Sequence, residues 1–590
     1  MSRLVLSNGE LHVELNQTAE LDSLYYPFIG HEQHASGLKH KIGVWVDGDI
    51  HWLDNPSWQF KSRLPQGALI GNTTAKNEDI GILLEFDDFV STDTMAFYRN
   101  IHIVNLRQES RSIRLYLHQA FQISGYTDNQ DTAQYLAGVP GVLHYRGRRA
   151  FVAGGIDSMG VSFDQWTVGR FGGDLAGSWM DAEDGSLSSC SNEVGLTDSV
   201  IGFSLEIPVL ASTRVFYWLT ASKSPRNAIA THEQIFAKGV YQNMEKTENN
   251  WRKWLSPAFR IANQVSSTHQ KKFVDSVIAI KAHVDLRGSV VSGQFCQIQE
   301  ACYSLWPLIR LGYKDEALNF FTFCKQIIDP KDGYLLSRYR ADGSWGVLTD
   351  KFDSQSRPKL LPEDTALVLF IVTQFHAVNA KANYAKELYP NLIRPMSNFL
   401  ASYIDKETKL PLTNSTYSSA VVYASLLASS EIAEQLGEQA DSVHWRSVAS
   451  DILEASAQLF DERQGYFVKS LSDKSLEIDS FFASFMFGLV ELDDDRLKRT
   501  FRALKKMRLS SGLYCRHELS SQSDLLASLW VAQYLMETDE SLEADKIIQA
   551  VSNYIGPSGA MLNNKIDGSR FDLATTSEYV STLLDTIIAK

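Results

Sequence analysis

The spacing of apolar residues changes once along this chain of 590 residues, at about residue 255, and this change constrains the fold more than any other feature. Before it, apolar and polar residues alternate over short runs that turn residues separate, which is typical of antiparallel strands. After it, apolar residues recur with the 3.6-residue period of amphipathic helices. We therefore expect two domains, residues 1–254 and residues 255–590, because a chain of this length exceeds a single core.

The first part contains two strong signals for β-hairpins. In LVLSNGELHVEL, Asn8-Gly9 separates two alternating runs, and VWVDGDIHWL repeats the pattern with Asp47-Gly48. Further strand-like runs begin at Gly81, Ile113, Val142, Ser199 and Val215. Many short strands joined by polar turns predict a large antiparallel β-sandwich.

The second part contains twelve candidate helices, several with a capping residue or an acidic first turn. They begin near Val265, Glu300, Asp315, Glu363, Tyr389, Ser418, Ser442, Asp479, Asp495, Asp524, Ser541 and Thr575. Twelve helices suit six helical hairpins, which either close into a ring or stack as an open solenoid. Periodicity alone does not choose between these two arrangements.

Charge and composition exclude several classes of function. The chain has 70 acidic and 56 basic residues, and its net charge of −14 argues against a nucleic-acid or anionic-membrane partner. No apolar run approaches the roughly 20 residues that span a bilayer, and the N-terminus lacks the pattern of a secretory signal. The five cysteines form no C-x-x-C pair, so we expect reduced thiols in a cytoplasmic protein without a metal or a cofactor.

Several stretches resemble the sequence motifs of one known family. They include LYYPFIGHEQH at Leu24, GYLLSRYRADGS at Gly333, PEDTALVLF at Pro362 and EIDSFFASFMFGL at Glu477. Over its whole length the chain resembles the bacterial glucoamylase-like proteins of glycoside hydrolase family 15. The resemblance implies an N-terminal antiparallel β-sandwich (a supersandwich) followed by an (α/α)6 barrel. The reaction of that family is the inverting hydrolysis of α-glucosides.

The two catalytic carboxyls of that family have no counterparts here. Inverting hydrolysis uses one carboxylic acid to protonate the leaving oxygen and one carboxylate to activate water. The family's acid lies in a Trp-Glu-Glu stretch after a Leu-Pro pair, but here Leu410-Pro411 is followed by LTNSTYSS. The family's base lies in a Pro-Glu-Gln stretch before the last helix, where the resemblance places Asn563. An asparagine side chain cannot accept the proton of the attacking water.

The family's glucose-binding Trp-Pro-Arg-Asp element is also altered, and it can be placed in two ways. Either Gln299-Glu300 replaces Arg-Asp, or Trp306 and its following proline are kept and Arg-Asp is lost. We favour the first placement, because it leaves the helix long enough for a barrel wall. The candidate substrate-binding residues from this element are therefore Gln299 and Trp306. Asn563, at the position of the family's base, is a third candidate.

Other side chains are candidates to replace the missing groups. Glu300, Glu363 and Asp364 are the fallback candidates for catalysis, although each opens a helix, where an acid also suits the helix dipole. Trp345, in ADGSWG, is a candidate substrate-binding residue, since a loop tryptophan either stacks on a sugar or anchors its loop.

Two hypotheses of function follow. In the first, the chain is a catalytically degenerate scaffold that binds an α-glucoside, a protein partner or a second copy of itself. In the second, it is an active α-glucoside hydrolase with relocated carboxylates. Each missing group would otherwise cost about 10²–10⁴-fold in rate. A pocket walled by Glu300, Glu363 and Asp364 favours the second hypothesis, and a filled barrel mouth or an exposed apolar patch favours a partner role.

Overall fold

The computed structural model divides the chain into two compact units. The β unit comprises residues 1–256, 281–286 and 556–559, and the helical unit comprises residues 257–280, 287–555 and 560–590. The residues described are 4–35, 37–65, 67–123, 130–345, 360–379, 383–538, 540–562 and 571–588. In this described part, no helix is both long enough and apolar enough to cross a bilayer.

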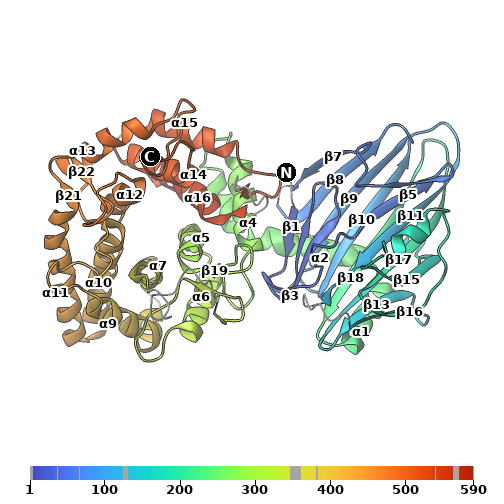
Figure 1. Ribbon diagram of the computed structural model, residues 1–590, viewed down its shortest axis with the longest axis horizontal. Helices are drawn as coiled ribbons and strands as arrows, with labels where there is room; N and C mark the ends of the chain where they lie inside the picture. Colours follow the sequence, from blue (N-terminus) through green and yellow to red (C-terminus); the bar gives the residue numbers. More distant parts are fainter. Residues whose placement is uncertain are drawn as a thin grey trace. The chain divides into compact units, whose positions relative to one another are not determined.

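The β unit consists of antiparallel sheets (Figure 1). A nine-stranded sheet has the order β16-β12-β13-β14-β18-β10-β9-β8-β7, a five-stranded sheet the order β15-β17-β11-β5-β6, and a four-stranded sheet the order β1-β2-β3-β4. The strands are β1 (Leu4–Ser7), β2 (His12–Leu15), β3 (Leu21–Phe28), β4 (His31–Gln33), β5 (Ile42–Val46), β6 (Asp49–Trp52), β7 (Gln59–Arg63), β8 (Ile70–Asn77), β9 (Ile82–Val90), β10 (Ala96–Asn105), β11 (Arg111–Ala120), β12 (Asp131–Leu136), β13 (Gly141–Arg146), β14 (Arg149–Asp157), β15 (Gln165–Arg170), β16 (Asn192–Gly195), β17 (Thr197–Ile207) and β18 (Ser212–Ser222).

Both predicted hairpins are present. Strands β5 and β6 pair across Asp47 and Gly48, whose φ angles of 56° and 97° fit the tight turn that an Asp-Gly pair favours. Strands β1 and β2 pair across the loop that contains Asn8, whose Oδ1 accepts hydrogen bonds from the amides of Glu10 and Leu11. The local turn chemistry therefore sets the register of each pair.

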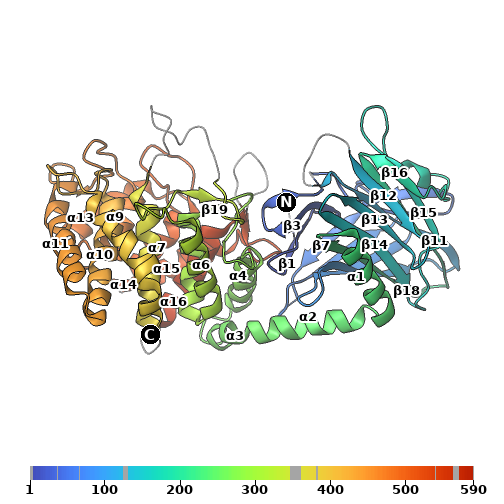
Figure 2. The ribbon, with the colours of Figure 1, turned by 90° about the horizontal axis from the view of Figure 1, so that it is seen from below.

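The expectation of strands up to Trp254 was wrong for its last thirty or so residues. Two helices, α1 (Pro225–Lys238) and α2 (Tyr241–Trp254), follow β18. Ser224 caps α1 by accepting a hydrogen bond from the amide of Asn227, and Pro225 occupies the first helical position, where its missing N–H costs nothing. Helix α1 packs on β13, β14 and β18 and buries Ile235 (Figure 2).

The helical unit contains a helix at or within a few residues of each predicted start. Its helices are α3 (Ser256–Ala262), α4 (Gln270–Ala282), α5 (Ile298–Leu311), α6 (Lys314–Ile327), α7 (Pro362–Val378), α8 (Tyr384–Leu388), α9 (Arg394–Ser402), α10 (Thr416–Leu436), α11 (Gln439–Ala455), α12 (Ile478–Met486), α13 (Asp495–Leu504), α14 (Leu525–Glu537), α15 (Ser541–Ser552) and α16 (Leu573–Ile588). The start predicted near Tyr389 is that of a short π-helix, Tyr389–Ile393, between α8 and α9. The largest displacement is at the first predicted start, where α4 begins at Gln270 instead of near Val265.

Six of these helices form a closed ring (Figure 1). Each of α5, α7, α10, α12 and α14 contacts the next in this order, α14 contacts α16, and α16 returns to contact α5. Helices α6, α9, α11, α13 and α15 each contact one or more members of the ring and lie outside it. The inner helices α7 and α14 are buried along most of their length, as expected for helices with neighbours on several sides. The arrangement is a ring and not an open solenoid.

Candidate functional site

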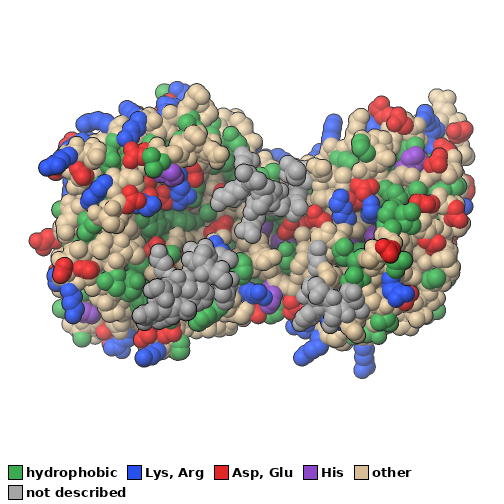
Figure 3. Space-filling view, in the orientation of Figure 1, with side chains coloured by type: hydrophobic (Ala, Val, Ile, Leu, Met, Phe, Trp, Pro, Cys, Tyr) green, Lys and Arg blue, Asp and Glu red, His purple; other side chains and the backbone are tan. Residues whose placement is uncertain are grey.

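A pocket of about 660 Å³ lies where the N-terminal ends of the six inner helices converge. Residues from the first turns of α5, α7, α10, α12, α14 and α16, or from the loops that precede them, line it. Figure 3 shows that the helical unit is hollowed, with acidic and basic side chains around the hollow. Among the described residues the charged lining groups are Glu300, Glu363, Asp364, Glu477, Asp479, Arg338, Lys469 and Arg516. A helix N-terminus carries partial positive charge, so this end of the ring can hold many acidic groups.

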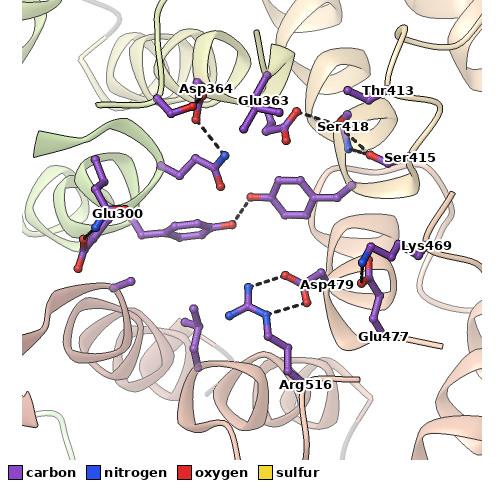
Figure 4. Close-up of a pocket in the computed structure, with 18 of the residues that line it drawn as sticks. Glu300, Glu363, Asp364, Thr413, Ser415, Ser418, Lys469, Glu477, Asp479 and Arg516 are labelled. Atoms are coloured by element: carbon purple, nitrogen blue, oxygen red, sulfur yellow. Dashed lines mark hydrogen bonds and ion pairs between the residues drawn. The ribbon is translucent and has the colours of Figure 1, made fainter. Parts of the chain in front are cut away.

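Helix α7 supplies two adjacent carboxylates to the pocket. Asp364 is 1% exposed, and its two oxygens accept hydrogen bonds from Gln299 Nε2 at 2.9 Å and Ser337 Oγ at 2.5 Å. Glu363 accepts a hydrogen bond from Ser418 Oγ at 2.8 Å (Figure 4). The structure thus brings Gln299, Glu363 and Asp364 together in one wall, as an amide and two acids from helices α5 and α7.

Glu300 lies at the other end of the pocket in Figure 4, close to the start of α16. Burial raises its pKa to about 7, and the nearby Asp572 adds to this effect. Hydrogen bonds from Ser292 and from the backbone amides of Leu573 and Ala574 favour the ionised form and limit the rise. At neutral pH Glu300 is therefore poised between its two protonation states.

The wall between Thr413 and Ser418 consists of hydroxyl groups. Ser415 caps α10 by accepting a hydrogen bond from the amide of Ser418, and its hydroxyl also donates to Ser418 Oγ at 2.8 Å. Thr413, Ser415 and Ser418 all line the pocket. The segment in which the resemblance expects a catalytic acid thus faces the pocket, and it contributes hydroxyls in place of a carboxyl.

Helix α12 supplies a second pair of acids. Glu477 accepts a hydrogen bond from Ser480 Oγ at 3.0 Å, and Lys469 Nζ lies 3.8 Å from its carboxylate. Burial, with a further contribution from Asp479, raises the pKa of Glu477 to about 7. Asp479 accepts two hydrogen bonds from Arg516, at 3.0 Å from Nε and 2.5 Å from Nη2, so the carboxylate and the guanidinium hold each other in place.

Sequence reasoning missed Glu477 and gave no role to Arg516. Glu477 immediately precedes a helix, as Glu300 and Glu363 open theirs, and this shared pattern was the available signal. Arg516 comes from a loop and reaches the pocket only because the backbone around it pairs with the start of α12, where the amide of Ile478 donates to the carbonyl of Arg516. No spacing in the sequence reveals this long-range contact.

Two tyrosines meet inside the pocket. The hydroxyls of Tyr303 on α5 and Tyr417 on α10 are 2.5 Å apart. Burial raises the pKa of both phenols well above the ordinary value, so both stay neutral at physiological pH. Trp530 on α14 also lines the pocket; its ring stacks on Phe482 and lies 5.5 Å from the Arg516 guanidinium.

Two predicted substrate-binding residues, Trp306 and Trp345, are not among the described residues that line this pocket. Trp306 lies on the same helix as Tyr303, but it packs against Phe370 beside a separate cavity of about 30 Å³. Trp345 is 55% exposed, and its backbone forms an isolated antiparallel β-bridge with that of Tyr339. Asn563 lies outside the described residues.

The fold is that of a glycoside hydrolase-like scaffold with an N-terminal antiparallel β unit. A bacterial glucoamylase solved in complex with acarbose matches 100% of this chain and 94% of its own, with a TM-score of 0.77 and 12% identity. A putative kojibiose phosphorylase from the human microbiome matches 98% of this chain and 85% of its own, with a TM-score of 0.55 and 9% identity.

Comparisons of sequence point to the same class. An uncharacterized glycosyl hydrolase of Methanocaldococcus jannaschii is 20% identical over 85% of this chain and 81% of its own length. A trehalase of Mycolicibacterium smegmatis is 21% identical over 58% of this chain and 57% of its own length. No protein-family model matches the chain.

Proposed function

We propose that the helical unit is an (α/α)6 barrel of the type found in glycoside hydrolase family 15, and that its pocket binds an α-glucoside. The closed ring of six inner helices and the match to a glucoamylase along the whole chain support this assignment. That glucoamylase was solved with acarbose, which makes a carbohydrate the first ligand to consider for this pocket.

The observation that carries the proposal is the mixture of donors and acceptors around one pocket. A sugar hydroxyl both donates and accepts hydrogen bonds, so its site needs both kinds of group in fixed positions. Gln299 and Asp364 are fixed by each other, and Arg516 is fixed by Asp479. The tyrosine pair and Trp530 add aromatic surface to the same walls.

We further propose that the standard acid and base of the family do not operate here. The hydroxyl wall from Thr413 to Ser418 supports the loss of the acid, and the assignment of Asn563 to the position of the base stays a prediction from the sequence. The pocket is open among the described residues, and this favours a small carbohydrate over a protein partner as its occupant.

Calorimetric titration with maltose, isomaltose, trehalose and acarbose tests the binding. We expect at least one of them to bind, and Gln299→Ala to weaken that binding about tenfold, because one well-placed hydrogen bond contributes roughly 0.5–1.5 kcal/mol. Gln439→Ala, at an exposed position that opens α11, is the matched control and should bind as the wild type does. Absence of heat with all four sugars at millimolar concentration would contradict the proposal.

A further inference from the structure

We propose that the bound glucoside is also cleaved, with Glu477 as the general acid and Glu363 as the general base. This inference rests on the proposed binding of an α-glucoside in the same pocket. It assigns the reaction to two carboxyls that helices α12 and α7 bring to the hydroxyl wall, in place of the carboxyls that the family normally uses.

The first argument is position. Glu363 contacts the hydroxyl wall directly through Ser418. Glu477 approaches the same wall through Lys469, whose carbonyl accepts a hydrogen bond from the amide of Thr416 at 3.0 Å and whose Nζ lies 3.8 Å from the Glu477 carboxylate. Figure 4 shows that the two glutamates come from different helices, with Glu363 beside Ser418 and Glu477 beside Lys469.

The second argument is that three other carboxyls of the pocket have different roles. Asp364 uses both oxygens as acceptors, from Gln299 and Ser337. Asp479 uses both oxygens as acceptors of the two hydrogen bonds from Arg516, so its carboxylate is already engaged by a cation. Glu300 lies beside the start of α16, away from the hydroxyl wall. Glu363 and Glu477 are the acids next to that wall among the described residues.

The third argument is the chemical difference between the two sites. Glu477 is largely withdrawn from water, with its side chain 13% exposed, and Asp479 lies nearby, so that burial and this charge hold its pKa near 7. A protonated fraction therefore persists at neutral pH, as a general acid requires. Glu363 accepts a hydrogen bond from Ser418, whose hydroxyl is itself the acceptor of one from Ser415. A carboxylate that accepts from an oriented hydroxyl is suited to receive the proton of a water molecule.

The step is a balanced hydrolysis. The Glu477 carboxyl transfers its proton to the glycosidic oxygen as the bond between that oxygen and C1 breaks. A water molecule forms the new bond to C1 from the opposite face and gives its proton to the Glu363 carboxylate. The products are β-glucose and the free alcohol, and the proton on Glu363 exchanges through solvent to restore Glu477. Inversion of the anomeric centre is the expected outcome.

Two substrates distinguish the role of the general acid from that of the general base. Fluoride leaves α-glucosyl fluoride without protonation, whereas the leaving oxygen of a disaccharide needs a proton. We expect Glu477→Gln to lose about 10²–10⁴-fold in cleavage of the disaccharide that binds best, while its cleavage of α-glucosyl fluoride changes less than about tenfold. Glu363→Gln should lose both activities. Glu462→Gln, an exposed glutamate of the same unit paired with Arg499, is the matched control and should keep both.

The outcomes distinguish this inference from the proposed function. Wild-type protein that binds a glucoside in calorimetry but releases no glucose overturns the inference and leaves the binding intact. Cleavage that Glu477→Gln leaves unchanged places the acid elsewhere and also overturns it. Release of the α-anomer, seen by NMR of the new anomeric proton, contradicts the assigned geometry. Absence of binding by any sugar overturns both proposals.

Discussion

At the scale of single residues, the environment of each carboxyl matters more than its identity. Burial raises the pKa of three glutamates to about 7, although they lie at different places in the fold. They are Glu300 in α5, Glu477 just before α12 and Glu578 in α16. Asp479, in contrast, accepts hydrogen bonds from the cationic side chain of Arg516. Which glutamate carries a proton at neutral pH is therefore decided by what surrounds it.

Glu578 lies outside the pocket and offers a clean test of this effect. It is 2% exposed on α16, where Gln533 Nε2 donates to its Oε1 at 2.5 Å. Because its pKa is higher in the folded than in the unfolded chain, the folded state holds the proton more tightly. The free energy of unfolding should then fall as pH rises from 4.5 to about 7. The loss attributable to Glu578 is on the order of 3 kcal/mol, and it remains above that range.

We expect Glu578→Gln to remove this contribution. Its free energy of unfolding in urea should decline less steeply between about pH 5 and pH 8 than that of the wild type, since glutamine does not titrate. The measurement is a set of denaturation curves at several pH values. The exposed variant Glu462→Gln should follow the wild-type slope, and a Glu578→Gln slope equal to the wild-type slope would contradict the prediction.

At the scale of elements, the starts of helices carry both the fold and the pocket. The predicted starts were accurate where a capping side chain or an acidic first turn marks them, because these signals act within one turn of the chain. Ser415 before α10 and Asp524 before α14 are caps of this kind. Helix α1 also had a local signal, Ser224-Pro225, but the preceding run of strands outweighed it in the prediction.

Ser415 should matter for stability and for the hydroxyl wall. We expect Ser415→Ala to lower the free energy of unfolding by about 1 kcal/mol, because the amide of Ser418 loses its acceptor. Ser415→Asp keeps an N-cap acceptor and should retain most of this stability. Thermal and urea unfolding of the three proteins side by side would measure the effect, and equal stability of the alanine and aspartate variants would argue against it.

At the scale of the whole molecule, the helical unit depends on closure of the ring. Helix α16 contacts both α14 and α5, and it buries Tyr579, Val580 and Leu583 among them. Each large apolar side chain contributes roughly 1.5–3 kcal/mol when buried, so loss of this helix removes an amount comparable with the 5–15 kcal/mol that stabilises a typical domain.

A chain truncated before Leu573 should therefore lose the cooperative unfolding of the helical unit. Calorimetry would measure the cooperativity of unfolding and hydrogen exchange the protection of the amides, with the full-length chain as the reference. We expect rapid exchange of the amides in α5 and α14, which would lie next to an open gap. Protection of both helices equal to that in the full-length chain would show that the ring does not need its last member.

The sequence by itself determined the order of the elements in this protein, because turn residues, caps and apolar periods act over a few residues. It also identified Glu300, Glu363 and Asp364 as acids at helix starts, together with Gln299. It could not show that these residues share a pocket with Glu477, Lys469 and Arg516. Those neighbours come from segments separated by tens of residues, as in the bonds from Gln299 to Asp364 and from Arg516 to Asp479.

Only the tertiary structure decided which helix starts converge. Closure of the ring turns the N-terminal ends of six distant helices toward one pocket, and it also turns Trp306 toward Phe370 and away from that pocket. A helical period fixes which face of a helix is apolar, but not which neighbour that face will meet. The composition of the pocket, and the protonation of its carboxyls, follow from that packing.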